Sequence, residues 1–174
     1  MEERIQFLRK KADRKRKLPE FLNELAKISN RCFDETEVLS VEQTEILKSE
    51  ISKRNFYQSV LVIAKPTGES NYIKQILTAL KPCLLEMSAY FSTNRYLDSF
   101  YLLTDASFVI DTFEKIIDFD GDTLFVYDIT LKNGFLIDLN EESWAIGERI
   151  EKLLTYELRV WGTEWIMKVS TQLS

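Results

Sequence analysis

The first 55 residues have the hydrophobic spacing of helices. Apolar positions recur every three or four residues in 3–17, as a thin stripe among charges, and more densely in 19–30, where Pro19 suits a first helical turn. Ser40-Val41-Glu42-Gln43 is a capping box, in which the serine caps a helix and the glutamine bonds back to it. The pattern predicts three N-terminal helices.

Strand patterns begin after this helical part. Residues 57–64 form a continuous apolar run rich in valine and isoleucine, which is typical of a strand covered on both faces. Helical spacing resumes up to Leu80, and Pro82 should end or kink that helix. Residues 83–91 fit a continued helix, although residues 87–91 also fit a strand.

Short strands and helices alternate beyond residue 98. Residues 99–103 predict a strand, and Asp105 can cap a helix that Asp120-Gly121-Asp122 then ends. A later strand is expected over residues 155–161, where apolar and less apolar positions alternate, and a short helix follows it.

The alternating pattern of residues 123–131 and 135–140 predicts two strands joined by a tight turn. A two-residue Asn-Gly turn would set Ile129 opposite an aspartate and mix apolar and charged side chains on one face. A three-residue loop ending in Gly134 keeps the face apolar and puts the glycine at the left-handed position of a bulged turn. We therefore predict that loop, with these cross-strand pairs: Ile129 with Ile137, and Tyr127 with Leu139.

Together these patterns predict one α+β domain, with a helical part over residues 1–55 and an α+β body over residues 56–174. We expect N-terminal helices, then a mixed, largely antiparallel sheet of four or five strands, then a short C-terminal helix. The hairpin should pair in antiparallel fashion with the strand at residues 155–161. A chain of 174 residues can form a stable core without disulfides or metals.

Charge is unevenly distributed along the chain. The net charge is −5, but residues 1–17 carry eight basic and three acidic groups, whereas residues 98–174 carry six basic and fifteen acidic groups. The chain has no histidine, which excludes Ser-His-Asp and Cys-His catalysis and histidine zinc ligands. A basic segment on an acidic body predicts that charge steers the approach of partners.

No targeting or membrane segment is expected. Residues 1–17 are too charged for the apolar centre of a signal peptide, and no apolar run approaches the roughly 20 residues that a membrane helix needs. Cys32 and Cys83 are far apart and belong to no C-x-x-C unit, so we expect two buried, reduced thiols. These features predict a cytoplasmic protein.

Several motifs that could carry chemistry fail on inspection. The acidic run from Asp118 to Asp122 does not fit a calcium loop, because no register supplies both the required glycine and the final glutamate. Gly68 and Gly121 stand outside any phosphate-binding motif. Paired carboxylates could do acid–base work, but acids in loops of an acidic body are usually solvated. We expect no metal, no cofactor and no small-molecule substrate.

Two further features have a functional and a structural interpretation. The basic run from Arg9 to Lys17 could contact nucleic-acid phosphates, but no aromatic residue lies within it to stack on bases. We therefore favour a solvated helix face, or a helix face docked on the protein's own acidic half, over nucleic-acid binding. Trp161 shares the more polar face of its strand with Glu157 and Arg159. It could be a binding anchor, or it could be covered by the terminal helix.

The C-terminal third resembles a known family. Three segments carry the resemblance: residues 120–128, residues 133–138, and residues 156–165 with their Trp-Gly pair and following tryptophan. They are similar to the C-terminal part of small bacterial immunity proteins of polymorphic or contact-dependent toxin systems, in particular the YxiF-like group. The resemblance implies an intracellular protein without enzymatic activity that binds and blocks one toxin domain.

From these observations we expect an immunity protein that covers the active cleft of a cognate toxin domain, and we expect that domain to be a nuclease. A regulatory or scaffolding protein-binding module is the alternative, and an enzyme that uses carboxylates alone is the least favoured class. The acidic C-terminal half should supply the interface, with Trp161 as an aromatic anchor. The other candidate residues are Asp118, Asp120, Asp122, Asp138, Glu141 and Glu142.

Overall fold

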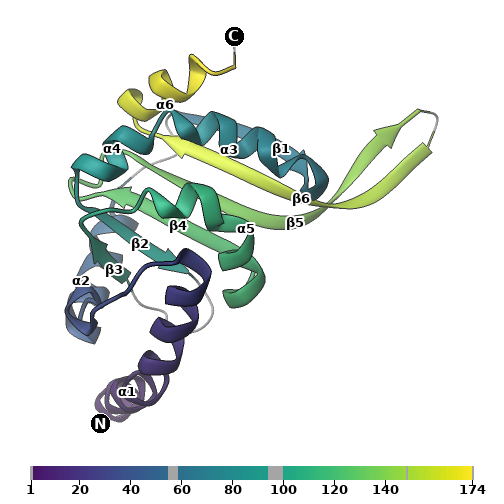
Figure 1. Ribbon diagram of the computed structural model, residues 1–174. Helices are drawn as coiled ribbons and strands as arrows, with labels where there is room; N and C mark the ends of the chain where they lie inside the picture. Colours follow the sequence, from purple (N-terminus) through teal and green to yellow (C-terminus); the bar gives the residue numbers. More distant parts are fainter. Residues whose placement is uncertain (1, 55–58, 94–99, 148, 174) are drawn as a thin grey trace.

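Six strands form one antiparallel sheet in the order β1-β6-β5-β4-β2-β3. The computed structural model describes the chain except residues 1, 55–58, 94–99, 148 and 174 (Figure 1). The strands are β1 (Val60–Pro66), β2 (Ala89–Thr93), β3 (Phe100–Leu103), β4 (Thr123–Asp128), β5 (Gly134–Ile146) and β6 (Arg149–Trp161). The helices are α1 (Glu2–Ser29), α2 (Val41–Ser52), α3 (Ser70–Thr78), α4 (Lys81–Glu86), α5 (Phe108–Asp120) and α6 (Thr163–Ser170), with short 3-10 helices η1 (Glu35–Glu37) and η3 (Thr67–Glu69). The α+β prediction is confirmed, with six antiparallel strands in place of a mixed sheet of four or five.

The two faces of the sheet are covered unequally. The first face packs against α1, α3, α4, α5 and α6 and holds the main core, to which the strands contribute Leu124, Val126, Phe135, Ile137, Leu158 and Val160. The second face packs against α2 in a smaller cluster, to which the strands contribute Phe125, Tyr127, Leu136 and Trp161. Most of the apolar burial that stabilises the fold therefore lies on the first face.

The N-terminal part contains two α-helices, so the prediction of three was wrong. α1 runs without a break through Pro19, because Phe21 and Leu25 continue the apolar stripe into the main core and their burial offsets the lost helical hydrogen bond. The capping box of α2 is confirmed. Ser40 Oγ accepts from the N–H of Gln43 at 3.1 Å, and Gln43 Oε1 accepts from the N–H of Ser40 at 2.8 Å.

The middle of the chain follows the sequence pattern with one correction. Pro82 lies in the first turn of α4 and separates it from α3, and β2 confirms the strand alternative from Ala89 onward. β1 is an edge strand, so the prediction of cover on both faces was wrong, and 53% of Val62 is exposed. The first residues of that predicted strand, 57 and 58, lie outside the described residues, as does residue 99.

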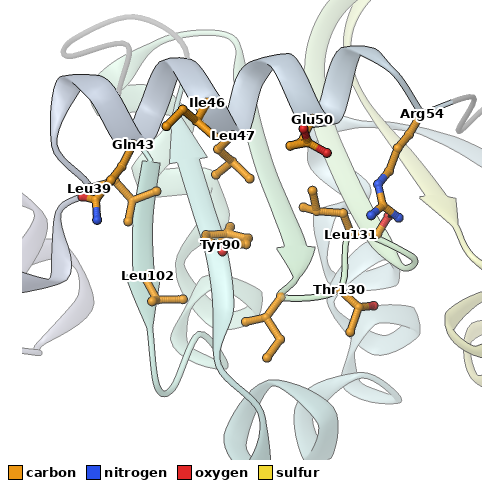
Figure 2. Close-up of a pocket in the computed structure, with 11 residues that line it drawn as sticks. Leu39, Gln43, Ile46, Leu47, Glu50, Arg54, Tyr90, Leu102, Thr130 and Leu131 are labelled. Carbon is orange, nitrogen blue, oxygen red and sulfur yellow. The ribbon is translucent and has the colours of Figure 1, made fainter.

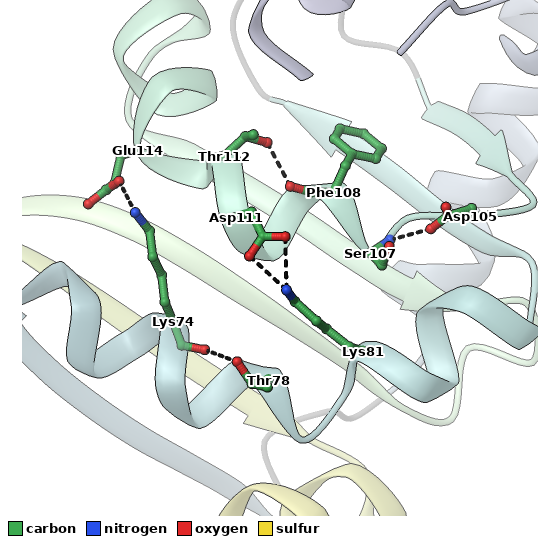
Figure 3. Close-up of polar contacts among 9 residues, drawn as sticks. All are labelled: Lys74, Thr78, Lys81, Asp105, Ser107, Phe108, Asp111, Thr112 and Glu114. Atoms are coloured by element: carbon green, nitrogen blue, oxygen red, sulfur yellow. Dashed lines mark hydrogen bonds and ion pairs between the residues drawn. The ribbon is translucent and has the colours of Figure 1, made fainter. Parts of the chain in front are cut away.

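Polar contacts join the helices on the first face (Figure 3). Lys81 Nζ contacts both carboxylate oxygens of Asp111 at 2.8 and 2.9 Å, and Lys74 of α3 pairs with Glu114 of α5. Ser107 is the N-cap of α5, and the carboxylate of Asp105 accepts a hydrogen bond from its N–H at 2.8 Å. These contacts hold α5 in place, and Gly121, with φ 99°, ends the helix as predicted.

The β4–β5 hairpin forms, but its predicted register was wrong. Leu124 pairs with Ile137, and Tyr127 pairs with Gly134, so the loop spans residues 129–133 and Gly134 lies within β5. The buried carboxylate of Asp128 organises that loop by accepting hydrogen bonds from the N–H groups of residues 132 and 133, the Asn133 side chain and the hydroxyl of residue 130. An internal acceptor of this kind stabilises a longer loop than the glycine alone indicates.

β5 and β6 are longer than predicted and pair from Gly134 and Trp161 to Ile146 and Arg149. Their antiparallel pairing confirms the prediction for residues 155–161. β4 accompanies β5 only as far as Asp138, and β1 accompanies β6 only as far as Thr155. The rest of the hairpin projects from the sheet (Figure 1), and we call residues 141–154 the arm.

Candidate partner-binding surfaces

The end of α5 and the start of β4 bring predicted acidic residues together. Asp118 is exposed on α5, and Asp122 is exposed just before β4. The N–H of Leu139 donates to the backbone oxygen of Asp122 at 2.7 Å, and Thr123 Oγ1 donates to Asp138 at 2.6 Å. These residues lie at the end of the sheet where β5 leaves it, with Asp118 on a helix of the first face and Asp138 on the second face. Asp120 lies in the last turn of α5.

Glu141 and Glu142 continue this acidic region onto the arm. Glu141 pairs with Lys152 across the hairpin at 2.9 Å, which neutralises it. Asp118, Asp122 and Glu142 form no ion pair with any residue that the structure describes. Burial raises the pKa of the Tyr156 hydroxyl, and the charges of Glu114 and Asp118 raise it further, because ionisation would add a negative charge among acids. We call Asp118, Asp122, Asp138 and Glu142 the acidic surface.

Trp161 is not available as an exposed anchor, because only 6% of it is accessible. Its indole lies on the second face, with its ring centroid 5.2 Å from that of Tyr127. It also lies across Gly134, where a Cβ atom would stand 2.6 Å from Trp161 Cε2. The indole packs in one cluster with Leu47 of α2, so the cover comes from an N-terminal helix and not from the terminal helix.

The arm exposes apolar side chains that the sequence analysis missed. Ile146, Ile150 and Leu154 are 48%, 79% and 55% exposed. Trp144 steadies the base of the arm by donating its Nε1–H to Thr155 Oγ1 at 2.7 Å. Gly147, with φ 61°, turns the chain between the strands. A glycine between two runs of strand-forming residues was the available signal, but charged residues interrupt the alternation on both strands.

A groove of about 450 Å³ lies between α2 and the second face (Figure 2). Its walls are mostly apolar, and Ile46 of α2 and Ile129 of the β4–β5 loop are exposed at its sides. Glu50 and Arg54 lie at one end, and Arg54 Nη1 donates to the backbone oxygen of Leu131 at 3.1 Å. Among the residues that line the groove, Glu50 is the only carboxylate. The groove suits an apolar chain segment better than a reaction that needs paired acids and bases.

The basic N-terminal segment docks on α2. Lys10 pairs with Glu45 at 2.9 Å, Lys11 pairs with Glu42, and Arg14 donates to the backbone oxygen of Leu39. Burial lowers the pKa of the Arg14 guanidinium, against the opposing effects of Tyr101 and Glu42. Of the two alternatives favoured for this segment, docking on the acidic C-terminal half was wrong, because Lys10 and Lys11 pair with acids of α2. Most of the segment is a solvated helix face, as the other alternative predicted.

The described residues contain no group of three or more cysteine, aspartate or glutamate residues placed to hold a metal ion. Hydrogen bonds hold the carboxyl pKa of Asp34 and Glu42 below their ordinary values, whereas a general acid at neutral pH needs a raised pKa. Cys83 is buried, but Cys32 is exposed, which corrects the prediction of two buried thiols.

No helix in the described part of the chain has the length and apolar content required to cross a membrane. Comparison of the chain with family models, curated proteins and solved structures gave no significant match.

Proposed function

We propose that this protein is an inhibitor that binds a cognate toxin domain, as the resemblance of its C-terminal third implies, and that this domain is a nuclease. One observation carries the proposal: unpaired acids and uncovered apolar side chains lie at the same end of the molecule. Asp118, Asp122 and Glu142 lie near the base of an arm on which Ile150 and Leu154 are exposed on one face and Ile146 on the other. An apolar centre with a charged rim is the usual composition of a protein interface.

The charge of this surface fits the proposed partner. A nuclease cleft is basic because it holds phosphates, so an acidic surface can approach it faster and exclude partners of the same sign. Two basic side chains of α1, Lys10 and Lys11, are paired with Glu45 and Glu42 of α2, away from the arm. An inhibitor that acts by covering the active cleft of its toxin needs no histidine, metal or cofactor of its own.

A regulatory or scaffolding module is the second candidate, and the groove between α2 and the second face favours it. A module of this kind would bind an apolar segment in the groove. The two functions use different surfaces, so substitutions separate them. Ile150→Asp should abolish toxin binding and leave groove binding intact, whereas Ile46→Asp should do the reverse.

We expect the gene directly upstream to encode a large secreted protein with a C-terminal toxin module, and the test is co-expression with that module. We expect the protein to restore growth and to co-purify with that module, and we expect Ile150→Asp to lose both effects. Ile46→Asp, which places the same charge on another exposed isoleucine away from the arm, is the matched control. Failure of the wild-type protein to protect or co-purify, with the toxin active and both proteins folded, would contradict the proposal.

A further inference from the structure

The two edges of the sheet are protected to different degrees. β3, at one edge, has four residues, and an antiparallel bridge between Val38 and Tyr101 brings the chain near η1 against it. β1, at the other edge, has seven residues and pairs with β6 alone among the described strands. An edge strand directs the N–H and C=O groups of alternate residues away from the sheet, where they can pair with another chain.

β1 carries features that usually prevent such pairing only at its C-terminal end. Its residues from Val60 to Ala64 are all apolar and uncharged, and none of them is fully buried. Charge enters only at Lys65, which is held by Glu69 at 3.0 Å and lies 4.5 Å from the ring centre of Tyr72. Pro66 comes last, so it leaves the rest of the edge free to accept a strand.

We propose that β1 pairs in antiparallel fashion with β1 of a second copy, which joins two sheets across a two-fold axis. An antiparallel pair is itself two-fold symmetric, so each edge meets its own equivalent and the assembly closes as a dimer. Pairing centred on Val62 sets Leu61 opposite Ile63 and Lys65 opposite Ser59. Pairing centred on Ile63 sets Lys65 opposite Leu61. Neither register places like charges opposite each other, so the edge is complementary to itself.

The size of the seam sets the expected strength of the dimer. Seven residues span roughly 23 Å, and one sheet with its helix layer is about 20 Å deep, so two copies bury on the order of 900 Å² in total. Stable complexes usually bury about 1,600 Å². We therefore infer a weak dimer that forms at micromolar concentration, and this proposal is independent of toxin binding because the acidic surface and the arm lie outside β1.

Val62 offers a matched pair of test variants. Its side chain is half-exposed and faces Arg159 of β6, so Val62→Glu gains an opposite-charge neighbour within the monomer. In the dimer the same substitution brings two carboxylates to the seam. Val62→Gln has the same shape without the charge. We expect Val62→Glu to raise the dimer dissociation constant about fivefold or more at low salt, and high salt to restore dimerisation, while Val62→Gln stays close to wild type.

The experiment combines sedimentation equilibrium with hydrogen exchange on the purified full chain. We expect a concentration-dependent dimer and slower amide exchange in residues 60–65 as concentration rises. A monomer at roughly 500 µM, far above micromolar constants, overturns the proposal. The proposal is also overturned by a dimer in which the exchange rates of these amides do not change and Val62→Glu has the same dissociation constant as Val62→Gln. If exchange of these amides slows only when a toxin domain is added, the edge pairs with a strand of that partner. This result would also overturn pairing between copies.

Discussion

The β5–β6 hairpin has two halves with the same backbone pairing and opposite surroundings. In the half within the sheet, Phe135 and Leu158 are fully buried beneath α5 and α6. In the arm, Ile150 and Leu154 are mostly exposed, although the cross-strand pairing continues without interruption. A two-stranded hairpin is marginally stable on its own, so the embedded half anchors the arm. The difference indicates that the first half stabilises the fold and leaves the second free to bind.

Truncation of a core residue should give the largest effect. Phe135→Ala removes a fully buried ring from the first face and should lower the free energy of unfolding by about 3–5 kcal/mol. Ile150→Ala in the arm should change it by no more than about 0.5 kcal/mol. Urea denaturation of both variants measures the difference. Equal losses would mean that the arm is part of the core.

A smaller effect is expected where Trp161 lies across Gly134. A Cβ atom at Gly134 would stand 2.6 Å from Trp161 Cε2 and 2.7 Å from the backbone oxygen of Val126, so Gly134→Ala should cost about 1–3 kcal/mol through overpacking. Gly68→Ala, which meets nothing within 4 Å, is the control. The measurement is the thermal unfolding midpoint of the two variants. If Gly134→Ala unfolds at the same temperature as the wild type, the indole does not occupy this position.

The smallest effect concerns the Lys74–Glu114 pair and depends on pH. Burial alone would raise the pKa of Glu114, but hydrogen bonds from Lys74 and Ser70, with the charge of Lys74, lower it below the ordinary 4.5. The ionised group therefore stabilises the fold above about pH 4.5, and this contribution is lost as pH falls. Glu114→Gln should cost about 0.5–1 kcal/mol at pH 7 and almost nothing at pH 3. A difference that is constant between these pH values would contradict this assignment.

Features set by local chemistry could be predicted from the sequence. The capping box of α2 depends only on Ser40 and Gln43. Pro82 separates α4 from α3 and Gly121 ends α5 because of the backbone conformations that these two residue types favour. The continuous α1 could not be predicted, because the helix crosses Pro19 only where tertiary burial holds it. The register of the β4–β5 hairpin depends on the loop that Asp128 organises and on a distant residue, Trp161, whose indole lies across Gly134.

The candidate site was predictable in part for the same reason. Asp118 and Asp122 are close in the sequence, but Asp138 joins them only through the pairing of β4 with β5. The arm was missed because an exposed hairpin has no core to impose strict alternation on its residues. Trp161 has the expected strand orientation, and α2, from a distant part of the chain, covers it.

Association kinetics test the acidic surface most directly. The measurement is the association rate with the upstream-encoded toxin module, as a function of salt, for three proteins: wild type, Asp118→Lys/Asp122→Lys, and Glu35→Lys/Glu86→Lys. The last pair changes net charge equally at exposed glutamates of η1 and α4. We expect the aspartate reversal to slow association by about tenfold and to flatten its salt dependence, with the control much closer to wild type. Equal rates and equal salt slopes for the two double variants would contradict binding at the acidic surface.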